Sequence, residues 1–454
     1  MSQLLAISAL DGRYRDKVES IAPLVSEFGL MRNRIVVECN WFQHLADAAD
    51  IPQLPVLDAA QQAAVGKIYA SFEISDAQRI KKIENTTNHD VKAVEYFVKE
   101  KIGAISGLSA HTEFVHFACT SEDINNLAYG LMLSQVRERV LLPLMNELIG
   151  ELESLAARTA AIPMLSRTHG QAASPTTLGK EMRNFSERLR GQRQRFTDVE
   201  ILGKMNGAVG NYNAHLAAYP DVDWPRLTDS FVSGLGLTTN SHTTQIEPHD
   251  YIAELFHAMV RFNQILLDFD RDIWSYIAID YFGQRNIEGE VGSSTMPHKV
   301  NPIDFENSEG NLGIANALLQ HMASKLQVSR WQRDLSDSTV LRNIGSVVGH
   351  CAIAYMATLK GLSRLEINGD VIASDIDESW EILAEAVQTV MRKYGVAEPY
   401  EQLKRVTRGK RLDRELFKNI LEELNLPVEA KAELEQLTPA DYIGLANDLA
   451  TGPD

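Results

Sequence analysis

The sequence contains few cysteines and no arrangement of them that predicts a disulfide framework or a metal site. Of its 454 residues, three are cysteine: Cys39, Cys119 and Cys351. They are odd in number and far apart, and no C-x-x-C pair occurs, so neither a set of disulfides nor a zinc site is indicated. This cysteine usage favours a reducing compartment, and we expect no metal.

Long apolar runs and an excess of basic residues are also absent. No apolar stretch reaches membrane-spanning length, and the N-terminus lacks the basic and apolar segments of a signal peptide. The chain has 61 acidic and 44 basic residues, a net charge of −17, which disfavours a surface for nucleic acid or anionic membrane. We therefore expect a cytoplasmic protein that binds neither nucleic acid nor membrane.

The sequence lacks the motifs of several cofactor-dependent enzymes. It has no G-x-G-x-x-G after a strand, no G-x-x-x-x-G-K-[ST] and no H-E-x-x-H. Dinucleotide, P-loop and zinc-protease sites therefore have no support, and we expect no cofactor.

The sequence is rich in segments whose apolar residues recur with the periodicity of an α-helix. From Asp250 to Phe282, apolar residues recur in steps of three and four. This 3.5-residue period predicts a helix of roughly 40 Å or more that supercoils left-handedly in a bundle. A similar stripe covers residues 178–202, and Pro175 suits the first turn of its helix. Further long helices are predicted over residues 124–160, 304–328 and 339–362.

Five successive long helices predict the architecture. Because each buries little surface alone, together they imply a central bundle and self-association through uncovered faces. A chain of this length is longer than a single hydrophobic core usually accommodates, so more than one domain is expected. We expect an all-α fold of three helical domains over residues 1–110, 111–365 and 366–454. The first includes a helix over 23–49, and the last has short helices broken at Gly395, Pro399, Pro427 and Pro439.

Polar segments separate the expected helices. Residues 11–14 have the composition of a turn, and residues 86–90 that of an N-cap for a helix over 91–101. The basic run 408–411 is interpreted as a solvated helix junction. Three further segments, at 120–123, 166–171 and 330–342, concentrate functional groups between long helices.

The segment 330–342 is the richest in positive charge. It contains Arg330, Arg333, Ser336, Ser338 and Arg342, close to the start of a helix predicted near Thr339. Guanidinium groups beside a helix N-terminus suit a phosphate or carboxylate ligand. Surface ion pairing with Asp334 and Asp337 is the alternative interpretation of this pattern.

His169 follows a polar segment and precedes Gly170, with a helix expected from Pro175. An imidazole is the natural proton carrier near neutral pH, so His169 is a candidate acid or base. An isolated loop histidine can also be incidental.

Residues 288–302 read E-G-E-V-G-S-S-T-M-P-H-K-V-N-P. The glycines free the backbone, so its N–H groups can turn toward an anion, and Lys299 adds a positive charge near Ser293. The string resembles the signature of the fumarase/aspartase superfamily, G-S-S-x-M-P-x-K-x-N-P, at every fixed position from Gly292 to Pro302. Within that superfamily, His298 and the runs at 86–92, 120–123 and 244–250 resemble the adenylosuccinate lyase family in its longer bacterial form.

The resemblance covers essentially the whole chain and implies a fumarase/aspartase-like fold and an activity. It implies release of fumarate from adenylosuccinate, giving AMP, and from the succinylated aminoimidazole carboxamide ribotide (SAICAR), giving AICAR, both in purine biosynthesis. It also implies a homotetramer in which each active site draws residues from three subunits.

The resemblance further assigns roles to residues. Ser293 resembles the general base that removes the proton from the succinyl carbon next to the carboxylate. Lys299 and Asn301 would hold the charge that develops there. His169 resembles the general acid that protonates the departing nitrogen, and Glu306 the carboxylate that orients it. His89 resembles a second histidine that contacts the succinyl portion.

The remaining expected site residues bind substrate. For the phosphate these are Arg13, Tyr14, Ser338 and Arg342; for the succinyl and base groups, Thr120, Ser121, Gln245, Ser294 and Arg333; Asn88 and Asp90 complete the set. Two alternatives remain. Another fumarate-releasing lyase, such as argininosuccinate lyase, aspartase or fumarase, shares the G-S-S-x-M-P core. A catalytically idle relative, of the kind found among lens crystallins, would keep the bundle alone.

Overall fold

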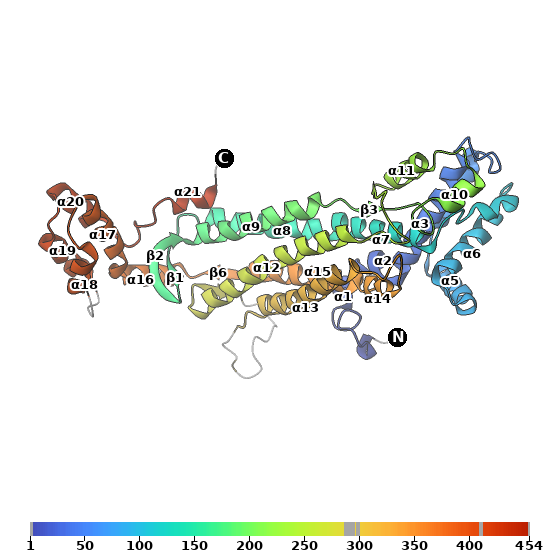
Figure 1. Cartoon of the computed structure of the whole chain (residues 1–454). Helices are drawn as coiled ribbons and strands as arrows, with labels where there is room; N and C mark the ends of the chain where they lie inside the picture. Colours follow the sequence, from blue (N-terminus) through green and yellow to red (C-terminus); the bar gives the residue numbers. More distant parts are fainter. Residues whose placement is uncertain (1–2, 286–295, 297–299, 408–411, 453–454) are drawn as a thin grey trace. The chain divides into compact units, whose positions relative to one another are not determined.

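The computed structural model describes residues 3–285, 296, 300–407 and 412–452 (Figure 1). The described residues are mostly helical and include three two-stranded sheets. The chain forms two compact units. The first comprises Met1–Met145, Gln192–Asn263 and Gly310–Ala354, and the second comprises Asn146–Gly191, Gln264–Glu309 and Tyr355–Asp454. The three-domain division remains a prediction.

The long helices that the periodicity predicts are present. They are α7 (Ser121–Val136), α8 (Leu142–Arg158), α9 (Leu178–Asp198), α12 (Asp250–Ala278), α13 (Ile303–Leu326) and α15 (Ile344–Leu362). A π-helical turn over Arg137–Leu141 joins α7 to α8, which together make the helix expected over 124–160. None of the helices in the described ranges is long and apolar enough to cross a membrane.

Helix α12 packs on its neighbours in both units. In the second unit the ring of Phe269 lies 5.4 Å from that of Phe185 on α9 and 6.4 Å from that of Phe305 on α13. In the first unit the Asn263 amide donates to the Asn316 amide oxygen on α13 at 2.9 Å. Figure 1 shows α12 running beside α13 and α15. The apolar stripe read from the sequence is therefore the buried face of α12.

The other elements of the first unit are further helices and one small parallel sheet. They are η1 (Gln3–Leu5), α1 (Arg15–Val18), α2 (Ala22–Val25), α3 (Glu27–Ala46), α4 (Ala59–Ala70), α5 (Ile74–Thr87), α6 (Asp90–Gly103), η2 (Ser109–Phe114), β3 (Leu202–Gly203), α10 (Asn213–Ala218), α11 (Trp224–Gly234), β4 (Thr238–Thr239) and α14 (Ser336–Leu341). The helix expected over 23–49 is instead two helices. Ser26 is extended between them, and its hydroxyl accepts from the Gly29 amide as the N-cap of α3.

The helix expected over 339–362 is also divided. It begins early, as α14, and resumes as α15 at Ile344. The side-chain amide of Asn343 donates to the Thr339 carbonyl at 3.0 Å. The backbone N–H of Asn343 donates instead to the Val340 carbonyl. The side chain thus takes the acceptor that a continuing α-helix would use for its backbone.

A β-hairpin in the second unit was not predicted. Strands β1 (Pro163–Thr168) and β2 (Gln171–Thr177) are antiparallel and are joined by His169 and Gly170, whose φ angles are 54° and 76°. Positive φ at both positions is the requirement of the commonest two-residue hairpin turn. The expected helix start at Pro175 is therefore wrong: Pro175 pairs with Leu165 in the sheet, and α9 begins at Leu178.

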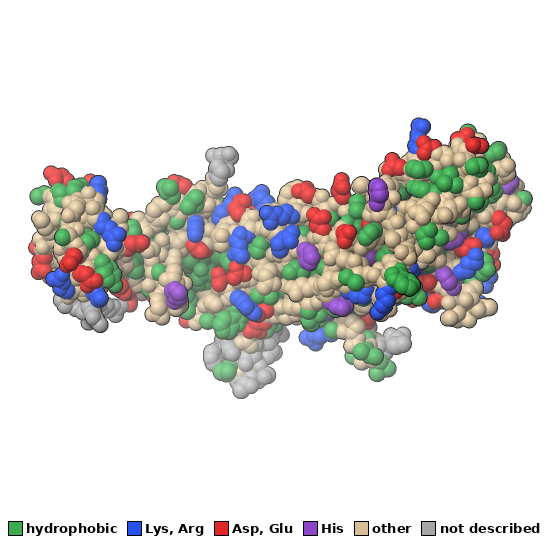
Figure 2. Space-filling view, viewed as in Figure 1, with side chains coloured by type: hydrophobic (Ala, Val, Ile, Leu, Met, Phe, Trp, Pro, Cys, Tyr) green, Lys and Arg blue, Asp and Glu red, His purple; other side chains and the backbone are tan. Residues whose placement is uncertain are grey.

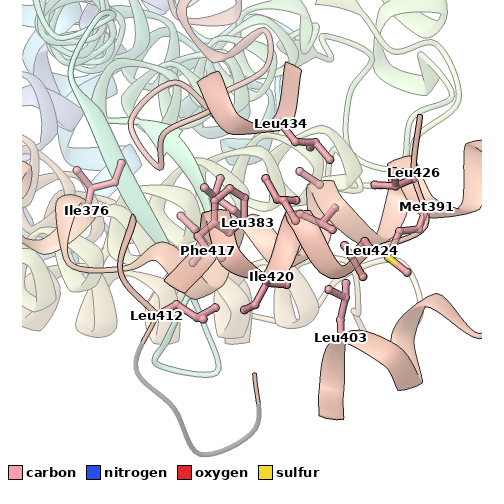
Figure 3. Close-up of a cluster of buried hydrophobic side chains, with 14 of the residues drawn as sticks. Ile376, Leu383, Met391, Leu403, Leu412, Phe417, Ile420, Leu424, Leu426 and Leu434 are labelled. Carbon is pink, nitrogen blue, oxygen red and sulfur yellow. The ribbon is translucent and has the colours of Figure 1, made fainter. Parts of the chain in front are cut away.

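The rest of the second unit is a small sheet and a group of short helices. They are β5 (Phe282–Gln284), β6 (Leu365–Ile367), α16 (Gly369–Asp377), η4 (Trp380–Leu383), α17 (Ala384–Lys393), α18 (Pro399–Thr407), α19 (Arg414–Glu423), α20 (Val428–Gln436) and α21 (Ala446–Thr451). Leu383, Phe417 and Ile420 lie in the hydrophobic core of these helices (Figure 3). The predicted breaks hold, since α18 begins at Pro399 and α20 follows Pro427. The basic run at 408–411 lies outside the described residues.

Charged side chains of both signs cover α9. On the face shown in Figure 2, basic side chains over α9 are interspersed with acidic ones. Arg188 pairs with Asp268 of α12 at 2.8 Å, and Arg190 pairs with Glu153 of α8. Arg188 and Arg190 thus link α9 to α12 and to α8.

Candidate active site

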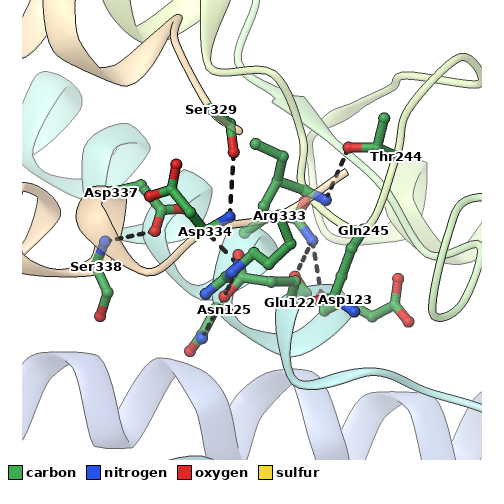
Figure 4. A network of polar contacts seen from close by, with 12 residues as sticks. Glu122, Asp123, Asn125, Thr244, Gln245, Ser329, Arg333, Asp334, Asp337 and Ser338 are labelled. Carbon is green, nitrogen blue, oxygen red and sulfur yellow. Dashed lines mark hydrogen bonds and ion pairs between the residues drawn. The ribbon is translucent and has the colours of Figure 1, made fainter. Parts of the chain in front are cut away.

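Four polar segments that the sequence singles out lie together in the first unit. They are the start of α6, the start of α7, the loop before α12 and the segment 329–342 that includes α14. Figure 4 shows Glu122 and Asn125 of α7 beside Arg333, with Asp337 and Gln245 close by. The chain therefore brings residues more than 200 positions apart into one cluster of charges.

Asp90 connects the start of α6 to two arginines. Its Oδ2 accepts from Nη2 of Arg34 at 2.9 Å and from Nη2 of Arg342 at 2.8 Å. Burial opposes ionisation of this carboxyl, but the charge of Arg34 and the hydrogen bonds from both arginines lower the pKa of Asp90 well below its usual range. Arg34 is 3% exposed and Arg342 44% exposed, so Arg342 presents its guanidinium to solvent.

A second chain of contacts leads from Arg34 to Arg333. Arg34 Nε donates to the Asn125 amide oxygen at 2.8 Å, and Asn125 donates to Glu122 at 2.8 Å. Glu122 pairs with Arg333 Nη1 at 2.7 Å. The alternative of surface ion pairing fits Arg330, which is 84% exposed and pairs with Asp334, but not Arg333, which turns into this cluster and is 17% exposed.

Asp337 and His249 extend the cluster on the far side of Arg333. Asp337 Oδ2 lies 3.7 Å from Arg333 Nη1 and 3.6 Å from His249 Nε2. Its Oδ1 accepts from the backbone N–H of Ser338 at 2.6 Å. His249 Nδ1 lies 3.6 Å from Glu247. Ser338, an expected phosphate ligand, is therefore fixed by a buried carboxylate.

The start of α7 places Thr120 and Ser121 beside these charges. Asp123 Oδ2 accepts from the Thr120 amide at 2.8 Å, and its Oδ1 pairs with Lys204 Nζ at 2.9 Å. Both charged side chains are fully buried. Their pairing anchors the helix N-terminus, whose free N–H groups attract anions.

Gln245 and His89 flank the cluster from two further segments. Gln245 donates to the Ala208 carbonyl at 3.1 Å, and its neighbour Thr244 donates to the Gln332 carbonyl at 3.0 Å. His89 is the N-cap of α6: its Nδ1 accepts from the Lys92 amide at 3.1 Å. Because Nδ1 is an acceptor, the proton of a neutral His89 ring belongs on the exposed Nε2. Asn88 precedes it in the left-handed conformation, with φ 50°.

Arg13 and Tyr14 lie in the turn that the sequence predicts, immediately before α1. A cavity of about 180 Å³ nearby is lined by Asp11, Arg15 and Arg342, and by Gly345 at the start of α15. Arg13 itself is exposed and does not line this cavity. The turn that contains Arg13 therefore lies close to Arg342, and Arg15 joins the basic residues at this cavity.

In the second unit, His169 stands at the exposed tip of the hairpin. Its strand is anchored by Arg167, which pairs with Asp375 of α16, and Tyr281 also donates to Asp375. Glu306 accepts from the Trp274 indole at 3.2 Å, and within the described residues it makes no hydrogen bond to His169. The carbonyl of Asn301 accepts from Ile303 at the start of α13. Ser293, Ser294, His298 and Lys299 lie outside the described residues.

Several residues of the cluster are absent from the sequence predictions. Arg34, Asn125, Glu247 and His249 all take part in it, and Asp337 is expected from the sequence only as a surface ion-pair partner. A signal existed for two of them, because Glu247 and His249 belong to the 244–250 run. Arg34 lies within an apolar helix face, where a charge needs a buried partner. No group of histidine, cysteine and carboxylate side chains in the described ranges is arranged to hold a metal ion.

Comparison with known proteins identifies the class first. A family model described as lyase matches residues 12–316. Structures of 3-carboxy-cis,cis-muconate lactonizing enzyme from Pseudomonas putida and of β-carboxy-cis,cis-muconate cycloisomerase from Acinetobacter calcoaceticus share the fold, with TM-scores of 0.74 and 0.70 at 19% and 16% identity. Each match covers 95% of this chain, and 95% and 96% of the respective structures. The fold is that of the fumarase/aspartase lyases.

The family within that class follows from two further matches. A model described as adenylosuccinate lyase C-terminal matches residues 329–443. Adenylosuccinate lyase of Escherichia coli K12 is 58% identical over 98% of both chains, and that of Haemophilus influenzae 57% identical over 99% of this chain and 98% of its own. The chain belongs to the adenylosuccinate lyase family.

Proposed function

We propose that this protein cleaves the C–N bond of adenylosuccinate to give AMP and fumarate, and that of SAICAR to give AICAR and fumarate. One observation carries the proposal beyond family membership. Arg342 is held at 2.8 Å by Asp90 at the start of α6, and Arg333 at 2.7 Å by Glu122 in the first turn of α7. Such preorganised cations suit a substrate that carries a phosphate and two carboxylates.

The proposed reaction is a β-elimination by a base and an acid. Ser293 removes the proton from the succinyl carbon next to the carboxylate, and Lys299 and Asn301 stabilise the additional charge on that carboxylate. His169 protonates the departing nitrogen while Glu306 orients it. His89 donates from its Nε2 to the succinyl portion, which agrees with the acceptor role of its Nδ1 at 3.1 Å from the Lys92 amide.

Arg13, Tyr14, Ser338 and Arg342 are proposed to bind the phosphate. Asn88, Asp90, Thr120, Ser121, Gln245, Ser294 and Arg333 are proposed to shape the rest of the substrate site. The positive charge that the site needs is local, because the chain as a whole has a net charge of −17. We propose a cytoplasmic location for the protein and no cofactor.

We further propose a homotetramer whose active sites combine residues of three subunits. Large apolar side chains on α12 and α13 are exposed in the single chain, among them Trp274 at 48% and Ile314 at 49%. An exposed His169 without a hydrogen-bonded Glu306 also fits a site that a second copy completes. Exposed apolar patches of this kind mark association surfaces.

The first experiment is fumarate release, with the accompanying ultraviolet change of the purine. Adenylosuccinate would be compared with argininosuccinate, aspartate and malate. We expect turnover of adenylosuccinate alone. Turnover of another compound would favour a different lyase of the superfamily, and none from a folded protein would favour a catalytically idle bundle.

Two variants test the acid and the base. Ser293→Ala and His169→Asn should each abolish turnover and leave substrate binding intact. Asparagine before Gly170 keeps the hairpin turn, because Asn-Gly favours positive φ at both positions, so this variant removes the imidazole alone. Activity within tenfold of wild type would remove the residue concerned from the mechanism. Activity regained on mixing the two inactive variants would support sites shared between subunits.

A further inference from the structure

His249 is a buried histidine between two carboxylates, and the proposed reaction gives it no role. It is 2% exposed, its φ is 66°, and it comes immediately before α12. Its Nδ1 lies 3.6 Å from Glu247 Oε2 and its Nε2 lies 3.6 Å from Asp337 Oδ2. At these distances both contacts are ion pairs longer than a hydrogen bond.

The two carboxylates are held where they are. Glu247 accepts from the Asn240 amide at 2.9 Å and from the His249 backbone at 2.7 Å, and it is 1% exposed. Asp337 accepts from the Ser338 backbone at 2.6 Å and is 5% exposed. Neither carboxylate can turn to water, so each depends on a nearby cation.

Asp337 lies between two such cations. Its Oδ2 is 3.6 Å from His249 and 3.7 Å from Nη1 of Arg333, while the same Nη1 is 2.7 Å from Glu122. The charged groups that face His249 are thus Glu247 from its own loop, Asp337 from α14, Glu122 from α7 and Arg333. A neutral His249 would leave three carboxylates around one guanidinium. Asp337 would then compete with Glu122 and with the substrate for the guanidinium of Arg333.

We propose that His249, as an imidazolium, is a positioning residue that satisfies Asp337 and so leaves Arg333 available to the substrate. The inference rests on the proposed function, because it takes Arg333 to be a substrate ligand. Burial disfavours the charged ring, but Asp337 and Glu247 outweigh burial and raise the pKa of His249 to about 9. The imidazolium is therefore the resident form at neutral pH.

The test is His249→Asn, because asparagine tolerates a positive φ and carries no charge. KM for adenylosuccinate should rise about tenfold, the effect of one charge-assisted contact, while kcat changes less than about threefold. The wild-type KM should rise as pH increases through 9, and that of the variant should not. His350→Asn is the matched control: His350 is half-buried, bonds to Asn311 at 2.8 Å, and pairs with no carboxylate of the described residues.

A double variant separates this role from a structural one. In His249→Asn/Asp337→Asn the competitor for Arg333 is neutral, so KM should return to within about threefold of wild type. An unchanged KM in His249→Asn would overturn the proposal, and so would a double variant worse than either single one. If His249→Asn does not fold, a wild-type KM that is flat from pH 7 to 10 would overturn it.

The proposed reaction and the proposed role of His249 can be tested separately. Calorimetry would measure adenylosuccinate affinity for the wild type and for His249→Asn. A wild type that binds adenylosuccinate without cleaving it would refute the proposed reaction, and the affinity ratio would still test His249. A wild type that does not bind adenylosuccinate would refute both.

Discussion

Arg342 Nη2 donates to Asp90 Oδ2 at 2.8 Å, across 252 positions of sequence. The same oxygen accepts from Arg34, whose side chain is almost completely buried. One carboxylate oxygen thus connects the start of α6, the middle of α3 and the end of α14. Removing its charge would leave a buried guanidinium without a charged partner.

Asp90→Asn should destabilise the protein by about 3 kcal/mol at pH 7, the lower end of the cost of breaking a buried ion pair. Urea unfolding measures it. The control is Glu100→Gln, which breaks the exposed pair with Arg79, where the side chains are 51% and 45% exposed. That change should cost less than about 0.5 kcal/mol. Equal effects of the two substitutions would contradict the burial argument.

The pH dependence of this stabilisation has a definite sign. The pKa of Asp90 is lower in the folded protein than in the unfolded chain, where it is about 3.9. The stabilisation is therefore present above pH 4 and is lost as pH falls through the folded pKa. The stability difference between wild type and Asp90→Asn should shrink below pH 4.

The stabilisation contributed by His116 depends on pH in the opposite direction. Its Nδ1 lies 2.6 Å from Glu38 Oε1, and Glu38 is fully buried. Burial disfavours the charged ring, but Glu38 outweighs it and raises the pKa of His116 above its usual 6.5. This stabilisation is present below pH 6.5 and is lost as pH rises through the folded pKa.

Wild-type stability should therefore fall from pH 6 to pH 9 relative to His116→Asn. Asparagine suits the positive φ of 63° at this position, so the comparison isolates the charge. Unfolding free energies at the two pH values measure the difference. Glu38→Gln should abolish the same pH dependence, and a dependence that persists in Glu38→Gln would assign it to another group.

The sequence predicts the long helices because the 3.5-residue period extends over many turns, as in the stripe from Ile252 to Ile273 on α12. It does not predict the division at Ser26 or at Asn343. There, single side-chain bonds to the backbone decide where a helix begins or ends. It also misses the hairpin, because β1 and β2 contain no clear alternation.

The candidate site divides in the same way. Runs such as 120–123 and 330–342 announce functional groups because polar residues gather between apolar stripes. The residues that hold them, Arg34 and His249, are single polar positions in apolar or loop surroundings. Arg34 pairs with Asp90, 56 positions away, and His249 faces Asp337 of α14 as well as its near neighbour Glu247. The contacts with Asp90 and Asp337 join separate segments, so only the folded chain reveals them.

The hairpin turn gives a prediction about Gly170. Its φ is 76°, and a Cβ added there would meet no atom within 4 Å. Gly170→Ala should therefore destabilise the protein by about 1 kcal/mol through the backbone alone. Gly150→Ala, in the exposed face of α8 and with similar free space, should instead stabilise it by about 0.5–1 kcal/mol. Thermal unfolding measures both, and the same sign for both would contradict the turn assignment.

Asp270 is a buried carboxyl in the second unit, on α12. Its Oδ1 accepts from Thr358 of α15 at 3.0 Å, and the same hydroxyl contacts Ser308 of α13 at 2.8 Å. Burial raises the pKa of Asp270 well above its ordinary value, although hydrogen bonds from Ser308 and Thr358 oppose the shift. Folding at neutral pH must therefore protonate this carboxyl or bury its charge, and either costs free energy.

Asp270→Asn should accordingly stabilise the protein at pH 7–8, by about 1–3 kcal/mol, the cost of an incompletely satisfied buried polar group. The sign with pH follows from linkage. Because the folded pKa is the higher one, wild-type stability rises as pH falls toward the unfolded pKa of about 3.9, and the advantage of asparagine disappears there. Asp268→Asn, on the same helix but in a 2.8 Å surface pair with Arg188, should change stability by less than about 0.5 kcal/mol at any of these pH values. Urea unfolding from pH 4 to 8 distinguishes the cases, because a buried charge that Ser308 and Thr358 fully satisfied would make Asp270→Asn destabilising at pH 8.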